Sequence, residues 1–173
     1  MNEYYINKCL RYAEQASDDE EVPVGTVIID LMTYKVIGFG YNCKEKKKNC
    51  LCHAEIMAIN MACKKKNSKI LKNCTIYSTL EPCLMCLGAI NEAQIDTLYF
   101  GTKNNKNNHF TEQLFNGKTA VNMQNEKCSK IFKLHDESSI ENIKKLRNYQ
   151  NNIYYYIFDI KDGNILLYLL CEH

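Results

Sequence analysis

The sequence has no long apolar run and no strong net charge. No apolar stretch approaches the ~20 residues that a membrane-spanning helix needs. The first residues carry an acid at Glu3 and no cationic region before an apolar stretch, so we expect neither a secretory signal nor a transit peptide. The net charge of +2 argues neither for nor against a nucleic-acid partner. We therefore expect an intracellular protein, cytoplasmic or nuclear, with no membrane partner.

Cysteine, in contrast, is abundant, with 10 residues in a chain of 173. In a reducing compartment, cysteines bind metals or are simply buried more often than they form disulfides. The chain length fits one ordinary globular domain. A composition of 46% hydrophobic and 24% charged residues is close to the average of such domains.

Hydrophobic periodicity predicts alternating helices and strands along the first hundred residues. The expected helices cover residues 3–16, 53–66 and 81–93, and the expected strands cover residues 22–30, 35–41, 74–80 and 95–100. We expect Pro82 in the first turn of the third helix. The second helix is expected to carry an apolar stripe of Ala54, Met57, Ala58, Met61 and Ala62. This order of elements predicts an α/β fold.

The pattern is weaker after Gly101. It predicts a short helix at 110–115, a strand at 119–123 and a helix from Ser138 to Leu146 that opens with capping-box spacing. The two apolar runs around Asp162-Gly163 are typical of a β-hairpin with a tight turn.

Cys83 and Cys86 stand three residues apart, directly after Pro82. In a helix that opens at Pro82, both thiols lie on one face of the first turn. Free backbone N–H groups and the helix dipole lower the pKa of a thiol there and favour the thiolate that zinc requires. Two buried core cysteines are the alternative, and the C-x-x-C spacing alone does not decide between them.

His53 and Glu55 stand together at the start of the helix expected over 53–66. In an α/β sheet, the carboxyl ends of parallel strands and the helix starts that follow them collect on one edge. We therefore expect His53, Cys83 and Cys86 to meet there as three ligands of one metal ion.

Three protein ligands are typical of a catalytic zinc that keeps its fourth position for water. Zinc makes hydroxide available at neutral pH, and a carboxylate outside the shell, here Glu55, can pass on the proton. Attack on an amidine-like ring carbon with loss of ammonia is hydrolytic deamination. Cys50 or Cys52, just before His53, could instead close the shell as a fourth ligand and make the site structural.

The sequence HAE at 53–55 followed by PCLMC at 82–86 resembles the H-x-E…P-C-x-x-C pattern of zinc-dependent cytidine and adenosine deaminases. With EVPVG at 21–25, GYN ending at Asn42, HAEIMAI and STLEPCLMCLGAI, about residues 3–103 resemble the tRNA adenosine deaminases. In that family, the wobble adenosine of the tRNA anticodon becomes inosine.

The resemblance implies a cytidine deaminase-like three-layer α/β/α sandwich around a central mixed sheet of about five strands. Separately from the resemblance, we expect the deaminase domain to cover residues 1–150, with residues 151–173 as a C-terminal β-hairpin extension packed on or appended to it. One zinc ion per chain would be bound by His53, Cys83 and Cys86, with Glu55 as the proton shuttle.

The resemblance also implies a set of substrate contacts. Asn42 would hydrogen-bond the target nucleoside, and Val24 would line the base pocket. The backbone around Ala54 and Cys83 would contact the leaving group or the nucleophile. The partners would be a tRNA anticodon loop and either a second copy of the chain or a related deaminase-like subunit. Since this chain keeps Glu55, it would be the catalytic half of such a pair.

Two other functions use the same zinc ligands. One is a deaminase of a free base or nucleotide, such as guanine, cytosine or deoxycytidylate. The other is a non-catalytic zinc-binding partner subunit, whose mark would be the loss of Glu55. Lysine clusters at 44–48, 64–66 and 144–147 are either solvated surface or contacts to RNA phosphates. The cluster at 44–48 must lie near the pocket, because it separates Asn42 from His53.

Overall fold

The chain divides into two compact units, Met1–His135 and Asp136–His173. The computed structural model describes residues 1–104, 110–115, 118–135, 155–161 and 164–170. None of the helices in these ranges has the length and apolar character needed to cross a membrane.

The first unit is built on a mixed sheet of five strands in the order β2-β1-β3-β4-β5. The strands are β1 (Gly25–Asp30), β2 (Lys35–Tyr41), β3 (Cys74–Leu80), β4 (Thr97–Thr102) and β5 (Thr119–Asn122). β1 runs antiparallel to both of its neighbours, whereas β3, β4 and β5 are parallel. The expectation of a mixed sheet of about five strands is confirmed.

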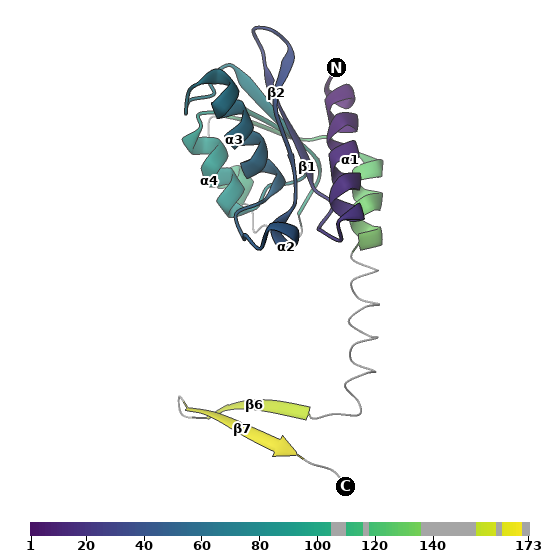
Figure 1. Ribbon diagram of the computed structural model, residues 1–173, viewed down its shortest axis with the longest axis vertical. Coiled ribbons are helices and arrows are strands. Elements are labelled where there is room, and N and C mark those ends of the chain that lie inside the picture. Colours follow the sequence, from purple (N-terminus) through teal and green to yellow (C-terminus); the bar gives the residue numbers. More distant parts are fainter. Residues whose placement is uncertain (105–109, 116–117, 136–154, 162–163, 171–173) are drawn as a thin grey trace. The chain divides into compact units, whose positions relative to one another are not determined.

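Helices cover both faces of this sheet and make three layers (Figure 1). They are α1 (Asn2–Asp18), α2 (Lys44–Lys47), α3 (Ala54–Lys66), α4 (Leu84–Glu92) and α5 (Phe110–Leu114). Residues 126–135 are also helical. In Figure 1, α3 and α4 lie on one side of the sheet, and α1 lies on the other side with the helix at 126–135. The expected α/β/α sandwich is confirmed.

The central strand β1 is buried on both faces, as its β-branched sequence predicted. Ile28 points into the core under α3 and α4, while Val27 and Ile29 point into the core under α1. This alternation follows from the two-residue period of a strand. β1 therefore provides a fully buried support for the helices on both faces of the sheet.

α3 packs closely on β2 because two glycines lie beneath it. A Cβ atom at Gly40 would collide with the carbonyl oxygen of Ala54 and the side chain of Met57, and one at Gly38 would meet Ala58. Glycine permits this close approach of helix and strand backbones. The contact fixes the position of the first turn of α3.

Two element boundaries and the exposure of one apolar side chain differ from the expectations. β1 begins at Gly25 instead of residue 22, because Val24 N–H bonds back to the Val22 carbonyl at 2.7 Å in a tight turn. α4 begins at Leu84, so Pro82 precedes the helix and does not lie in its first turn. Met61 is 38% exposed, because α3 meets the glycines of β2 through its small side chains.

The second unit contains β6 (Tyr155–Lys161) and β7 (Asn164–Leu170), which pair antiparallel with Lys161 opposite Asn164. The strand pairing expected for the hairpin is thus confirmed. The Asp162-Gly163 turn and the helix expected from Ser138 lie outside the described residues.

Candidate metal centre

The topology of the sheet brings two helix starts to one edge. β2 and β3 both run antiparallel to β1, so they point in the same direction with β1 between them. α3 follows β2 after the segment 42–53, and α4 follows β3 after residues 81–83. Both helices therefore begin at the same edge, as the sequence predicted.

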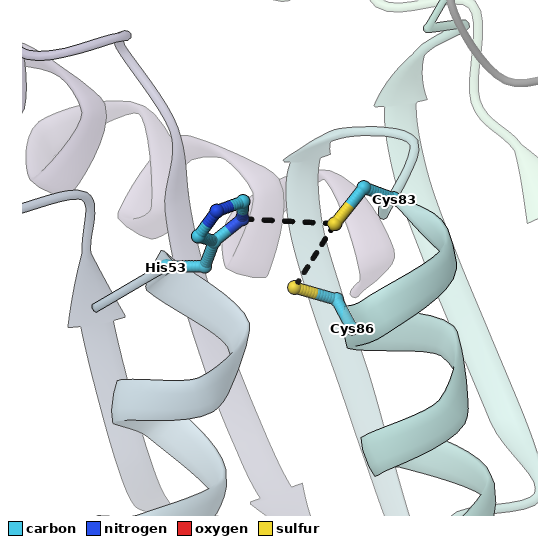
Figure 2. A group of neighbouring side chains, drawn as sticks. All are labelled: His53, Cys83 and Cys86. Carbon is cyan, nitrogen blue, oxygen red and sulfur yellow. Dashed lines mark hydrogen bonds between the residues drawn. The ribbon is translucent and has the colours of Figure 1, made fainter. Parts of the chain in front are cut away.

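The predicted metal ligands meet at this edge. His53 is the N-cap of α3, Cys83 is the N-cap of α4, and Cys86 lies in the first turn of α4. The Cys83 Sγ atom lies 3.7 Å from His53 Nδ1 and 3.7 Å from Cys86 Sγ. Figure 2 shows the three side chains pointing toward one another from the two helices.

The spacing of these donor atoms fits zinc. All three ligand atoms lie within 4.8 Å of one another. Around a tetrahedral zinc with Zn–S of about 2.3 Å and Zn–N of about 2.0–2.1 Å, neighbouring donors lie about 3.5–3.8 Å apart. Among the residues described, this is the one group of three His, Cys, Asp or Glu side chains that could hold a metal ion.

The pKa values of the two thiols are shifted by their neighbours in a way that favours binding of a cation. Contact with Cys86 and with His53 lowers the pKa of Cys83 to about 4. The hydrogen bond with Cys83 and burial raise the pKa of Cys86, and the repulsion between two adjacent thiolates adds to the shift. A divalent cation between the sulfurs removes that repulsion and favours both thiolates.

Glu55 is buried beside the cluster and is only 3% exposed. Burial raises its pKa to about 7, and its side chain contacts the thiol of Cys86. A carboxyl group with this pKa can accept and release a proton at neutral pH. Hydrogen bonding to Cys83 raises the pKa of His53, whereas the positive charge of Lys44 acts in the opposite direction.

Neither Cys50 nor Cys52 belongs to the group of donor atoms found in the described part of the chain. Cys50 is exposed, and Cys52 is buried with its carbonyl accepting the N–H of Cys43 at 3.1 Å. The expected set of three ligands, His53, Cys83 and Cys86, is the one that the fold brings together.

The residues expected to bind substrate are connected by hydrogen bonds. Asn42 Nδ2 donates to the Val22 carbonyl at 3.0 Å, and Asn42 Oδ1 accepts the Ala54 N–H at 2.9 Å. The backbone N–H of Asn42 also donates to the carbonyl of Val24, which is buried. Asn42 therefore ties the segment before β1 to the first residue of α3. Among the described residues, one N–H and one lone pair of the Asn42 amide have no further partner.

Two buried carboxylates that the sequence analysis did not single out hold the loops around the site. Glu81 accepts the hydroxyl of Thr111 at 2.6 Å and the N–H of Asn104 at 3.1 Å, which anchors the segment after β4. Glu21 accepts the N–H of Lys46 at 2.9 Å and so fixes α2. Their shared sequence signal is an acid one or two residues before a proline, in EVP and EPC.

Comparison with known families defines the class of the protein. The sequence model of the cytidine and deoxycytidylate deaminase zinc-binding region matches residues 1–102. The three-layer fold and the His/Cys cluster with its buried glutamate agree with that match. Fold and site thus define a zinc-dependent deaminase.

Individual relatives narrow this class. The tRNA-specific adenosine deaminase of Rickettsia bellii is 44% identical over 117 residues, which cover 66% of this chain and 81% of that protein. A structure from studies of A-to-I editing by tRNA deaminases at the wobble position is 28% identical with a TM-score of 0.67, covering 74% of this chain and 98% of that one. A guanine deaminase from Bacillus subtilis is 29% identical with a TM-score of 0.55, covering 58% of this chain and 64% of that one. The chain belongs to the family of the tRNA-specific adenosine deaminases.

Proposed function

We propose that this chain is a zinc-dependent hydrolase that converts adenosine to inosine at the wobble position of tRNA. The observation that carries the proposal is the convergence of His53, Cys83 and Cys86 with Glu55 buried beside them. The 44% identity to a tRNA-specific adenosine deaminase supports the choice of adenosine in tRNA as substrate.

In this proposal, His53, Cys83 and Cys86 hold one zinc ion per chain. When bound, zinc supplies an acidified water at neutral pH. Glu55 would act as the proton shuttle, with its carboxylate taking up a proton and delivering it to the departing amino group of the purine. The ring carbon gains an oxygen and loses the nitrogen, so adenosine and water become inosine and ammonia.

Asn42 and Val24 would bind the nucleoside. The amide of Asn42 keeps one N–H and one lone pair beyond its bonds to Val22 and Ala54. Val24 adjoins Asn42 through a backbone hydrogen bond and would contact the base with its apolar side chain. The N–H of Ala54 already donates to Asn42, so its contribution is to hold that amide in place.

The substrate would be presented by the anticodon loop. The ligand group is half-buried to buried, so a base reaches it only when it is splayed out of a stack. Loops of RNA offer such bases at a low cost in unstacking. The enzyme would act inside the cell, in the cytoplasm or the nucleus, where tRNA is found.

The chain would work as a homodimer or in a heterodimer with a related deaminase-like subunit. Its retention of Glu55 makes it the catalytic member in either case. The alternative substrate is a free base or nucleotide, which the likeness to a guanine deaminase favours. Both the coverage and the TM-score of that match are lower than those of the tRNA deaminase structure.

The test is inosine formation at the wobble position of an unmodified tRNA transcript by the purified chain, with zinc measured on the same sample. Inosine together with about one zinc per chain supports the proposal and shows that no second subunit is needed. Guanine, cytosine and deoxycytidylate are assayed in parallel. Turnover of one of them without any inosine would replace the proposal by the alternative.

A further inference from the structure

The structure gives different surroundings to the two lysine clusters that lie within the described residues. In the cluster at 64–66, Lys66 Nζ pairs with Asp30 at 3.0 Å, and Lys65 Nζ donates to the Val36 carbonyl at 3.2 Å. This cluster ends α3, whereas the metal ligand His53 lies at the start of α3. With a rise of about 1.5 Å per residue, the helix separates the two by roughly 20 Å.

The cluster at 44–48 lies at the opposite end of α3, beside the site. Lys46 pairs with Asp19 at 2.9 Å. The other three lysines, Lys44, Lys47 and Lys48, form no ion pair with any residue that the structure describes. Three positive charges without an ion pair among the described residues therefore lie on α2 and the residue that ends it, with one acid, Glu45, in the same turn.

Hydrogen bonds hold this segment in one conformation. The N–H of Cys43 donates to the carbonyl of Cys52 at 3.1 Å, which closes the base of the loop. Buried Glu21 accepts the N–H of Lys46 at 2.9 Å, which attaches α2 to the segment before β1. The lysines thus stand on a fixed support, and ordering them costs less free energy than ordering a free loop.

The segment is also directly connected to the site. Residues 43–52 connect Asn42 directly to His53. Lys44 lies close enough to His53 for its charge to act on the imidazole ring. When a base is splayed into such a site, the phosphates of its own strand stay at the mouth. Phosphate contacts supply much of the affinity for RNA, and a lysine ammonium binds phosphate as a point charge.

We infer that Lys44, Lys47 and Lys48 form a phosphate-binding face that holds the backbone of the RNA strand whose base enters the site. The inference rests on the proposed function, because it takes the substrate to be an RNA. It assigns the cluster at 44–48, and not the cluster that ends α3, to RNA binding.

The test compares two triple variants of the full, zinc-loaded chain. One replaces Lys44, Lys47 and Lys48 by Gln. The matched control replaces Lys64, Lys69 and Lys72 by Gln, which removes the same charge from exposed lysines that form no ion pair in the described residues. Binding of a fluorescent tRNA transcript is measured by anisotropy over a series of salt concentrations, and zinc content checks the fold.

For the variant at Lys44, Lys47 and Lys48, we expect the dissociation constant for tRNA to rise roughly tenfold or more at moderate salt. The slope of log affinity against log salt should become shallower by about 2, since each single-strand phosphate contact contributes about 0.7. The control should keep the dissociation constant and slope of the wild type. Arg at the same three positions keeps the charge and should restore both.

Equal binding by the variant and the control would overturn the inference, as would wild-type binding that is independent of salt. Inosine formation by the wild type is a separate readout. Lysine-dependent tRNA binding without inosine, together with turnover of guanine, cytosine or deoxycytidylate, would defeat the proposed function and leave the RNA face intact. Inosine formation by a chain whose tRNA binding does not depend on these lysines would support the proposed function and overturn the inference of an RNA-binding face.

Discussion

At the scale of single residues, we expect the largest effect on turnover from replacing Glu55. Its carboxyl group is buried beside the metal ligands. Replacing Glu55 by Gln keeps the shape of the side chain and removes the group that moves the proton. We expect turnover to fall by about 10²–10⁴-fold, the typical contribution of a positioned general acid or base. The measurement is single-turnover inosine formation.

Zinc content is the control for this variant. It should stay at the wild-type level, because Glu55 lies outside the proposed ligand set. Turnover within a few fold of the wild type would contradict the proton-shuttle role. Loss of zinc together with turnover would instead show that Glu55 positions the ligands.

The cysteines offer a second prediction at this scale. Replacing Cys83 by Ser removes a donor atom that lies 3.7 Å from both of its partners, so we expect zinc to be lost and activity with it. Replacing Cys50 or Cys52 by Ser should leave zinc bound, because neither thiol joins the donor group in the described residues. Metal analysis of the purified variants decides this. Loss of zinc from the Cys52 variant would restore the four-ligand alternative.

At the scale of secondary-structure elements, alanine substitutions at two glycines test how closely the helices are packed. Ala at Gly40 in β2 would collide with the backbone of α3 at Ala54. We expect it to lower the free energy of unfolding by about 1–3 kcal/mol, as overpacking does, and to weaken zinc binding by displacing the start of α3. Ala at Gly88 in α4 meets nothing within 4 Å and should stabilise the protein by about 0.5–1 kcal/mol.

Urea unfolding of the two glycine variants, with zinc measured on each, separates these effects. A Gly40 variant as stable as the wild type would mean that α3 and β2 can move apart without loss. A destabilised Gly88 variant would mean that its exposed face is covered in solution.

The sequence predicted most elements of the first unit because their hydrophobic periods are regular. Residues 35–41 and 74–80 match β2 and β3 at both ends. Features that depend on contacts with other elements were not predictable in the same way. The exposure of Met61 follows from the glycines under α3, which belong to a different element. α2 is a single turn anchored from outside by Glu21, so it has no period of its own.

The metal centre was predictable because its ligands stand at helix starts that topology brings to one edge. His53, Cys83 and Cys86 needed only the order of strands and helices to be placed together. The buried carboxylates were not predictable, because Glu21 and Glu81 act on Lys46 and Thr111, which are distant in sequence. The acid before a proline marks both glutamates in the sequence, but it does not identify the residues that they contact.

At the scale of the whole molecule, the chain separates into a unit that holds the metal centre and a C-terminal unit. We expect a chain that ends at residue 150 to keep one zinc and a single cooperative unfolding transition, because His53, Cys83, Cys86 and Glu55 all lie in Met1–His135. Metal analysis and thermal unfolding of the truncated and full chains check this. Loss of zinc on truncation would show that residues 151–173 belong to the deaminase domain.

The placement of β1 between β2 and β3 also has a consequence for how the protein matures. His53 follows β2 and Cys83 follows β3, and both of these strands pair with β1, which lies between them. A newly made chain can offer Cys83 and Cys86 as a local pair, but His53 joins them only after three strands have assembled. Tight zinc uptake therefore marks the assembly of these three strands, and the rate of uptake measures that step of folding.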